Sequence, residues 1–317
     1  MKILVTDSLS KSGIEDLKKA GHVVVEKKLS LKELIKEIPE YDCLIVRSST
    51  RVTKEVIEAG KNLKIIGRAG VGYDNIDVKA ASENGIIVKN APYGSIESVA
   101  ELTIALILAL SRNIPQACET LKSGKWEKKK YKGYELYGKT LGIIGCGRIG
   151  LKVAEMAKNG FNMNVIGFDP NKKESIIPLV KMNELLKKSD YISLHVPKLK
   201  KPIIGSEELK KMKNTAHLIN TSRGGNVDEK ALYEALKNNW IAGAAFDVFE
   251  NEGREGEKFE NKLLELPNFI ATSHLGASTF EAQERIAKEM AKVIIDFFKN
   301  GDLTNAVNIN EVKAEFS

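Results

Sequence analysis

The segment from Leu141 to Asp169 constrains the fold of this 317-residue chain more than any other part of it. Gly145, Gly147 and Gly150 form a G-x-G-x-x-G pattern directly after an apolar run, and a helix-like stretch and a second apolar run follow. In such a pattern the first glycine permits a tight turn, the second lets the backbone approach a pyrophosphate, and the third lets helix pack closely on strand. The segment therefore predicts a βαβ unit that binds a dinucleotide.

The acidic residue at the end of the second apolar run indicates which dinucleotide is bound. Asp169 would accept hydrogen bonds from a ribose 2′-hydroxyl and would repel a 2′-phosphate. The helix after Gly147 would direct unpaired N–H groups and a partial positive charge toward the phosphates. The alternative is a glycine-rich turn in some other α/β domain, but strand, helix, strand and terminal acid together favour an NAD site over both that turn and an NADP site.

About 140 residues precede this unit, which is enough for a separate domain. Their apolar runs are continuous rather than alternating, which is typical of strands covered on both faces of a parallel sheet. We predict these strands at Ile3–Val5, Val23–Val25, Leu44–Val46, Leu63–Ile66 and Ile86–Val88. Amphipathic stretches predict helices at Lys11–Lys19 (with Ser10 as N-cap), Leu31–Ile38 and Lys54–Ala59.

Two long helices are expected to connect the domains. An apolar helix from Ser98 to about Ser111 would carry the chain into the second domain, and an amphipathic helix from Glu281 to Lys299 would carry it back. Further strands are predicted at Tyr191–His195, Ala216–Ile219, Ala242–Asp247 and Phe269–Thr272. The chain would thus be an α/β protein of two doubly wound parallel-sheet domains, a discontinuous one at 1–96 and 290–317 and a dinucleotide-binding one at 97–289.

Composition and charge narrow the class of protein. The longest apolar stretch, Leu102 to Leu110, is too short to span a bilayer, and no charged leader followed by an apolar segment opens the chain. We therefore expect a cytoplasmic protein without a membrane partner. The net charge of +7 arises from 49 basic and 42 acidic residues that are interleaved, which favours a solvated mixed surface over a nucleic-acid site.

The cysteines and amides give two further expectations. Cys43, Cys118 and Cys146 are odd in number, far apart and mostly within apolar runs, so they predict buried free thiols and neither disulfides nor a metal site. The chain is rich in Lys, Glu and Ile and has only Gln116 and Gln283 as glutamines. This composition favours an origin in a high-temperature organism.

Polar side chains follow three predicted strands of the second domain. Arg223, Glu252 and His274 each come shortly after a strand, and the carboxyl ends of strands line the ligand crevice of an open parallel sheet. Arg223 would bind a substrate carboxylate with two hydrogen bonds. His274 would take the hydroxyl proton as hydride leaves for a nicotinamide, and Glu252 would hydrogen-bond the imidazole and stabilise the imidazolium. The three residues predict the oxidation of a 2-hydroxy acid.

Several motifs carry a family resemblance over essentially the whole chain. The glycine pattern, NTSRGGNVDEKAL, GAAFDVFENE and SHLGASTFEAQ resemble the D-isomer-specific 2-hydroxyacid dehydrogenases. Within that family IVRSSTRVT, GRAGVGYDNID, AELT and HLGAST most resemble the branch that oxidises D-3-phosphoglycerate to 3-phosphohydroxypyruvate at the start of serine biosynthesis. The resemblance is to the form without a C-terminal serine-binding module, because the chain stops at Ser317, and it implies no feedback inhibition through such a module.

The resemblance also implies an architecture and an assembly. It implies a Rossmann-type NAD domain and a flavodoxin-like substrate domain with the active site in the cleft between them, and a homodimer through the NAD domain. Domain closure would then exclude water during hydride transfer.

The resemblance assigns roles to individual residues. The substrate-binding Arg, the carboxylate and the acid/base fall on Arg223, Glu252 and His274. The substrate contacts that it implies are the backbone loop of Gly70, Val71 and Gly72, a phosphate-binding Arg47, an assisting Arg68, and Lys128 as a second phosphate contact. The cofactor contacts that it implies, beside the three glycines of the fingerprint, are Val71, Thr103, Arg148, Ile149, Asp169, His195, Val196, Pro197, Thr221, Ser222, Arg223, Asp247, His274 and Gly276.

Some positions depart from the family pattern. Ser273 and Gly253 stand where prolines usually flank the catalytic His and Glu, so both loops are expected to be less rigid. Asn226 replaces an apolar residue, Ser95 replaces a commoner Asn in the substrate loop, and Lys198–Pro202 lacks the usual threonines.

Alternatives remain for the site and for the function. His274 could be an ordinary packed histidine, Glu250 competes with Glu252 by proximity, and His195 could cap its strand rather than line the cofactor site; His22 and His217 are expected to be structural. The same chemistry on an unphosphorylated acid would make the chain a glyoxylate or hydroxypyruvate reductase. A non-catalytic NAD-sensing protein, like the corepressors that share this fold, could keep the three residues, and a nucleic-acid-binding module would need a basic patch.

Overall fold

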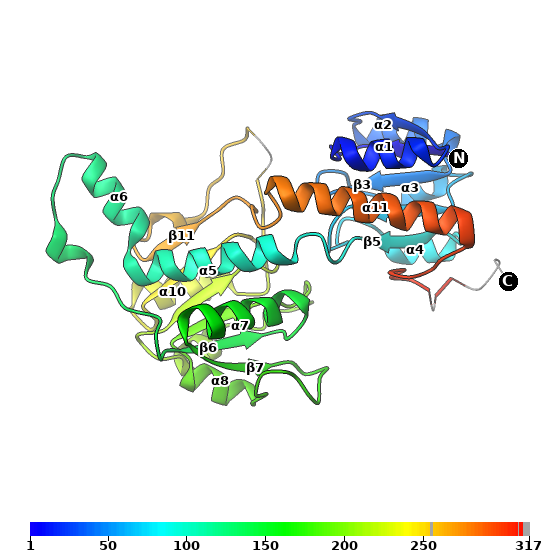
Figure 1. Cartoon of the computed structure of the whole chain (residues 1–317). Coiled ribbons are helices and arrows are strands. Elements are labelled where there is room, and N and C mark those ends of the chain that lie inside the picture. Colours follow the sequence, from blue (N-terminus) through cyan, green and yellow to red (C-terminus); the bar gives the residue numbers. More distant parts are fainter. Residues whose placement is uncertain (254–255, 310, 313–317) are drawn as a thin grey trace. The chain divides into compact units, whose positions relative to one another are not determined.

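The chain folds into two compact units (Figure 1). The computed structural model describes residues 1–253, 256–309, 311 and 312. Domain 1 comprises Met1–Ser95 and Ser278–Ser317, and domain 2 comprises Ile96–Ala277. The chain thus returns to domain 1 at Ser278, earlier than the expected residue 290, and residues 310 and 313–317 of the expected segment lie outside the described residues. Each domain is described below by itself.

Domain 1 contains a five-stranded sheet in the order β2-β1-β3-β4-β5. Its strands are β1 (Lys2–Val5), β2 (Val23–Glu26), β3 (Cys43–Val46), β4 (Ile65–Arg68) and β5 (Ile87–Asn90), all parallel. This is the flavodoxin-like order, in which the direction of winding reverses between β1 and β3. Every residue of β3 is buried, which explains its continuous apolar run.

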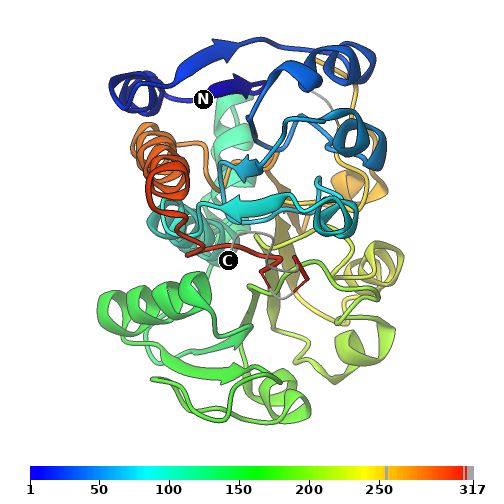
Figure 2. The same cartoon turned by 90° about the vertical axis from the view of Figure 1, so that its right-hand side faces the viewer.

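Helices cover both faces of this sheet (Figure 2). On one face lie α1 (Lys11–Lys19) and α11 (Phe280–Asn300), and on the other lie α2 (Leu31–Glu37), α3 (Lys54–Ala59) and α4 (Val78–Glu83), with the 3-10 turn η1 (Ile38–Glu40) after α2. A Cβ on Gly13 of α1 would lie 2.6 Å from the carbonyl oxygen of Ala287. The close packing of α1 on α11 explains why the whole of α11 belongs to domain 1. Ser10 is the N-cap of α1, but its hydroxyl accepts no hydrogen bond from the helix.

Domain 2 contains a six-stranded sheet in the order β11-β10-β9-β8-β6-β7. Its strands are β6 (Thr140–Ile144), β7 (Asn164–Phe168), β8 (Tyr191–Leu194), β9 (His217–Asn220), β10 (Gly243–Phe246) and β11 (Phe269–Ala271), all parallel. Winding reverses between β6 and β8, so the loops after these two strands lie at a topological switch point. The two parallel-sheet domains confirm the predicted fold class.

The helices of domain 2 also form two layers. One face of the sheet carries α5 (Ile96–Arg112) and α7 (Arg148–Phe161), and the other carries α8 (Met182–Lys188), α9 (Ser206–Lys211) and α10 (Glu229–Lys237), with the 3-10 turn η3 (Lys262–Glu265) before β11 (Figure 2). Each layer buries its own apolar cluster against the sheet. The carboxyl ends of all six strands consequently meet at one edge of a rigid core.

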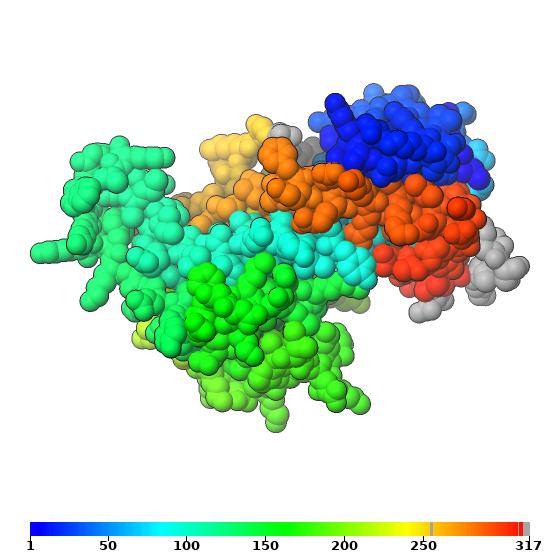
Figure 3. Space-filling view, in the orientation of Figure 1, coloured from blue at the N-terminus to red at the C-terminus, as the bar shows by residue number. Residues whose placement is uncertain are grey.

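A helix that the sequence analysis did not predict extends from domain 2. It is α6 (Ile114–Lys122), which starts after a left-handed Asn113 and is followed by the 3-10 turn η2 (Lys128–Tyr131). None of its residues is buried, and Trp126 in the following segment is 82% exposed. Figures 1 and 3 show this segment, 113–135, as an arm. Cys118 lies on it and is exposed, so the prediction of buried thiols holds for Cys43 and Cys146 only.

Among the described residues, no single helix combines the length and apolar composition that a membrane crossing needs. The pair α5 and α6 meets that test only when taken together, across a bend of 63°.

One buried histidine of the domain 2 core titrates abnormally. His217 begins β9, and its ring stacks on that of Tyr191 at a centroid distance of 5.3 Å. The hydroxyl of Ser111 in turn donates to Tyr191 Oη at 2.9 Å. Burial lowers the pKa of His217 from 6.5 to about 4, because the imidazolium would lose its hydration.

The free energy of unfolding should therefore fall as the pH falls from about 6.5 to 4. In that window His217 is protonated in the unfolded chain but neutral in the folded chain. This difference in proton binding lowers the free energy of unfolding by about 3 kcal/mol in total. Urea titrations at pH 7, 6 and 5 measure the loss. His217→Phe keeps the stacking and removes the proton, so it should lose the His217 part of the dependence and keep the part due to His195, whose pKa burial also lowers. An unchanged slope in this variant would assign the whole effect to other groups.

Candidate active site

The glycine-rich loop between β6 and α7 has the geometry that a dinucleotide site requires. Gly145 has a φ of +94°, and a Cβ there would lie 2.7 Å from the carbonyl carbon of His195. A Cβ on Gly150 would lie 2.2 Å from the carbonyl oxygen of Gly145, so only glycine lets α7 start this close to the strand. Around Gly147, by contrast, no heavy atom of the described residues lies within 4 Å of that position, which leaves room for a ligand phosphate.

Asp169 lies beside this loop at the end of β7. Its carboxylate accepts from the backbone N–H groups of Cys146 and Asn171, each at 3.0 Å, and Lys172 Nζ donates to the Cys146 carbonyl at 2.6 Å. The residue is thus in place to meet the ribose of a dinucleotide bound at the loop. Burial raises the pKa of the Cys146 thiol to about 11, so it is protonated at neutral pH and takes no part in nucleophilic chemistry.

The loops after β8 and β9 are joined by a buried residue, Asn226. Its amide donates to the Pro197 carbonyl at 3.1 Å and to Ser222 Oγ at 3.2 Å, and its oxygen accepts from Leu199 N at 3.1 Å. The Asn226 side chain, which stands where the family pattern has an apolar residue, therefore connects the predicted cofactor wall with the loop of Arg223. On the other side of the sheet edge, Thr103 Oγ1 and Thr221 Oγ1 share a buried hydrogen bond of 2.9 Å.

His195 follows β8 at the switch point. Its Nε2 lies 2.9 Å from Ser193 Oγ, and burial lowers the pKa of the imidazole. A neutral ring at this position suits a wall of a cofactor site better than a charged one would.

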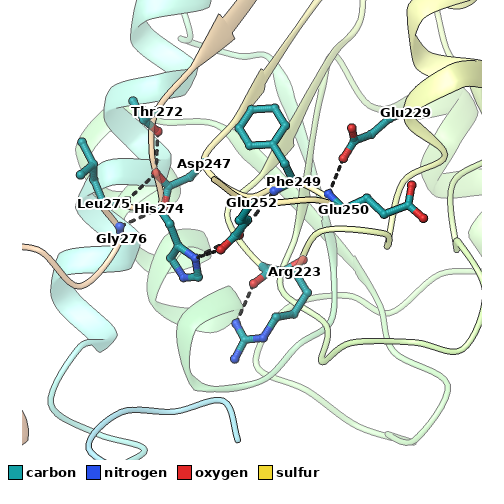
Figure 4. A network of polar contacts seen from close by, with 11 residues as sticks. Arg223, Glu229, Asp247, Phe249, Glu250, Glu252, Thr272, His274, Leu275 and Gly276 are labelled. Carbon is teal, nitrogen blue, oxygen red and sulfur yellow. Dashed lines mark hydrogen bonds and ion pairs between the residues drawn. The ribbon is translucent and has the colours of Figure 1, made fainter. Parts of the chain in front are cut away.

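The backbone on both sides of Arg223 is fixed by short contacts. Asn220 accepts from Ser222 N at 3.0 Å and donates to the Arg223 carbonyl at 3.1 Å, and Arg223 Nη1 donates to the Ser222 carbonyl at 2.7 Å (Figure 4). A Cβ on Gly224 would lie 1.7 Å from the Phe249 carbonyl oxygen. The glycine therefore lets the loop of Arg223 touch the loop after β10, which carries Glu252.

Glu252 and His274 form a pair. His274 Nδ1 lies 2.8 Å from Glu252 Oε2 and 3.0 Å from Oε1, and Figure 4 shows the two side chains pointing at each other. An ionised carboxylate only accepts, so Nδ1 carries the proton and Nε2 is left for a substrate. Burial alone would raise the pKa of the Glu252 carboxyl, but the hydrogen bond and charge of His274, the Phe249 N–H and the charge of Arg223 bring it below its usual value.

The backbone of His274 is unusual for a residue other than glycine, with a φ of +57°. Buried Asp247, the first residue after β10, holds the turn around it. Its carboxylate accepts from Thr272 Oγ1 at 2.6 Å, Leu275 N at 2.7 Å and Gly276 N at 2.9 Å, while its carbonyl accepts from His274 N at 2.8 Å. The turn thus aims the imidazole toward Glu252.

The predicted substrate contacts of domain 1 lie at the carboxyl edge of its own sheet. Arg47 follows β3, its backbone N–H donates to Asp7 Oδ2 at 2.6 Å, and its Nη1 donates to the Ser8 carbonyl at 3.3 Å. Arg68 ends β4 and donates to the Ala69 carbonyl at 3.3 Å. A Cβ on Gly70, which has a φ of +144°, would lie 1.7 Å from Arg68 Nη1.

Two residues that the sequence analysis missed support these loops of domain 1. Asn75 Nδ2 donates to the carbonyls of Arg47 and Thr50, and Asn90 Nδ2 donates to the Val71 carbonyl at 2.6 Å. Side-chain amides that bond the backbone over such sequence distances leave no local pattern.

Apart from Thr103 on α5, the predicted residues of domain 2 divide into two groups. At the carboxyl edge of its sheet, or at the start of α7, the structure places Gly145, Gly147, Arg148, Ile149, Gly150, Asp169, His195, Val196, Pro197, Thr221, Ser222, Arg223, Asp247, Glu252, His274 and Gly276. Lys128 lies instead in the exposed turn η2. Its role as a phosphate contact stays a prediction.

The family model for the NAD-binding domain of the D-isomer specific 2-hydroxyacid dehydrogenases matches residues 104–276. The chain is 50% identical to D-3-phosphoglycerate dehydrogenase of Methanocaldococcus jannaschii over 99% of its own length and 61% of that protein's. It is 49% identical to hydroxypyruvate reductase of Thermotoga maritima over 92% of its own length and 97% of that protein's.

A solved structure adds the fold. NAD⁺-bound 3-phosphoglycerate dehydrogenase of Entamoeba histolytica superposes with a TM-score of 0.81 at 33% identity, over 97% of this chain and 98% of that one. These matches confirm the resemblance that the motifs indicated. The chain, with its NAD-binding domain at 104–276, belongs to the D-isomer specific 2-hydroxyacid dehydrogenase family.

Proposed function

We propose that the chain is an NAD-dependent dehydrogenase that interconverts D-3-phosphoglycerate and 3-phosphohydroxypyruvate, the first step of phosphorylated serine biosynthesis. The observation that carries the proposal is the His274–Glu252 pair, which lies at the same sheet edge as Arg223 and a dinucleotide loop. The name and 50% identity of the Methanocaldococcus jannaschii relative support the phosphorylated substrate, although the chain spans only 61% of that protein.

The residues divide the work in the oxidation. Arg223 binds the substrate carboxylate through its planar guanidinium. His274 Nε2 takes the hydroxyl proton as the C–H bond breaks and the C=O bond forms, and Glu252 stabilises the resulting imidazolium through Nδ1. NAD, when bound, supplies the hydride acceptor. The glycine loop, Asp169 and the segment His195–Pro197 would hold it.

The test of this function compares three 2-oxo acids as substrates for NADH oxidation: 3-phosphohydroxypyruvate, hydroxypyruvate and glyoxylate. A higher kcat/KM for the phosphorylated acid supports the proposal. An equal or higher kcat/KM for an unphosphorylated acid would favour the reductase alternative, which the name of the Thermotoga maritima relative also favours. NADH binding without turnover of any acid would favour the NAD-sensing alternative.

Arg47→Ala should lower kcat/KM for 3-phosphohydroxypyruvate roughly 10- to 100-fold and leave hydroxypyruvate much less affected. A guanidinium that binds a phosphate contributes about 1.5–3 kcal/mol, and only the phosphorylated acid loses that contact. Arg51→Ala, an exposed arginine of the same loop, is the matched control. Equal losses for the two acids would refute Arg47, with Arg68 and Lys128 as the next candidates.

The proposed assembly is a cytoplasmic homodimer through domain 2, with no nucleic-acid or membrane partner. The exposed apolar side chains of the arm support a contact there, since Leu121 and Trp126 are 56% and 82% exposed. Light scattering of the chain and of Trp126→Glu tests it, because a buried carboxylate would dissociate a dimer that packs on this side chain. If the variant keeps the molar mass of a parent dimer, Trp126 does not lie in the dimer contact.

A further inference from the structure

One carboxylate of domain 2 holds both ends of the loop that carries Glu252. Glu229, the first residue of α10, accepts from the backbone N–H of Glu250 with Oε1 at 2.6 Å. Its other oxygen, Oε2, accepts from Asn261 Nδ2 at 2.7 Å. Figure 4 shows the Glu229 side chain directed at the backbone of Glu250. Glu250 and Asn261, one on each side of Glu252 in the sequence, are thereby bonded to a single group.

The partner at the far end of the loop is itself fixed. Asn261 is the N-cap of η3, and its Oδ1 accepts from Leu263 N at 3.0 Å. The amide therefore has one side bonded to the core element η3 and the other to Glu229. Among described residues the loop has further contacts: the Glu252 carboxylate bonds Phe249 N and His274 Nδ1, and the Phe249 and Phe259 rings meet at 5.0 Å.

The loop that carries Glu252 depends on contacts such as those of Glu229, because its own backbone is not stiffened by a proline. Gly253 follows Glu252, and a glycine leaves the backbone free where a proline would fix φ. The described atoms nearest to a Cβ on Gly253 would be those of the Phe259 side chain, at 3.4 Å or more. Beside the bonds of the Glu252 carboxylate itself, contacts at the ends of the loop therefore restrict the backbone that carries it.

We propose that Glu229 is a positioning residue for the acid/base pair: by clamping both ends of the 250–261 loop, it keeps the Glu252 carboxylate on His274 Nδ1. The inference rests on the proposed role of His274. The clamp acts from outside the site, since Glu229 bonds neither His274 nor Arg223 in Figure 4. Two short bonds to one carboxylate are charge-assisted, and such bonds resist loss more than neutral ones.

Three substitutions weaken the clamp in different ways. Glu229→Ala removes both bonds. Glu229→Gln keeps one accepting oxygen but turns an N–H₂ group toward a former donor. Asn261→Ala releases the far end and also removes the N-cap of η3. Glu234→Gln is the matched control, because Glu234 is on the same helix and also accepts from an amide, Asn238 Nδ2 at 3.2 Å, away from the loop.

The readouts separate positioning from stability. With Glu229→Ala we expect kcat to fall about 10- to 100-fold, as for a catalytic group displaced by around 1 Å, while the Kd for NADH stays unchanged. The alkaline limb of the pH profile for oxo-acid reduction should move to lower pH, because a displaced Glu252 stabilises the imidazolium less. The ¹⁵N shifts of the His274 ring, assigned by their loss in His274→Asn, should change from a proton on Nδ1 to a mixture of tautomers.

Each result decides the proposal. Graded changes in kcat and in the tautomer, largest for Glu229→Ala and absent for Glu234→Gln, support the clamp. A lower Tm with an unchanged pH profile and tautomer would overturn it and leave Glu229 a structural residue. The tautomer is read without substrate, so the clamp is tested even if the chain turns over none of the three acids. If Glu229→Ala does not fold, Asn261→Ala gives the same readouts.

Discussion

Replacing His274 by Asn is expected to lower kcat by about 10²- to 10⁴-fold while the Kd for NADH stays unchanged, because a positioned general acid/base contributes a factor of this size. The imidazole is the group whose Nε2 faces outward from the pair with Glu252. Asn is the right replacement because it tolerates the φ of +57° at this position, where Ala would add backbone strain. Stopped-flow and steady-state assays in both directions measure the loss.

Two control variants show whether the loss is specific to His274 and whether Glu252 or Glu250 is its carboxylate partner. His22→Asn removes an imidazole of domain 1 that packs at a tilt against the Phe298 ring, and it should keep full activity. Glu250→Gln tests the rival carboxylate and should also be active, because Glu252 and not Glu250 bonds the ring. If His274→Asn kept kcat within a factor of ten of the parent, His274 would be an ordinary packed histidine and the acid/base assignment would be wrong.

The sequence was sufficient to place candidate site residues whose positions follow from parallel-sheet geometry. Buried parallel strands appear in the sequence as continuous apolar runs. Since the carboxyl ends of parallel strands share one edge of the sheet, the polar residues after β9, β10 and β11 lie close together. The same logic located the glycine loop and Asp169. Because each of these features is encoded within a few residues of a strand end, local patterns were enough to find them.

Features that depend on contacts between distant segments were not predictable in this way. The return of the chain to domain 1 at Ser278 depends on Gly13 of α1 meeting Ala287 of α11, two helices far apart in sequence. Helix α6 has Ile114, Ala117, Cys118 and Leu121 at the spacing of an apolar stripe, yet none of its residues is buried. The exposure of Cys118 therefore could not be inferred from the local pattern. The left-handed backbone of His274 is set by Asp247 across the sheet edge.

Asp247 has two competing roles that the structure allows us to distinguish. The family resemblance assigns it to the cofactor. The geometry instead shows a buried carboxylate whose oxygens serve the turn of His274, with three hydrogen bonds from Thr272, Leu275 and Gly276. If the turn is its main task, its loss should change stability and catalysis together, with cofactor affinity affected least.

Asp247→Ala should therefore lower the free energy of unfolding by about 3–6 kcal/mol, since three donors, one buried and two partly buried, lose their buried acceptor at roughly 1–3 kcal/mol each with some relief from water. Asp247→Asn keeps one oxygen and should lose less. Urea unfolding gives the stability, and kcat should fall in both variants because the turn that holds His274 at positive φ loses side-chain acceptors and relies more on the backbone bond from His274 N to the carbonyl of residue 247. A variant with normal stability and kcat but a raised Kd for NADH would instead show that Asp247 is a cofactor contact, because only a ligand contact can be lost without disturbing the turn.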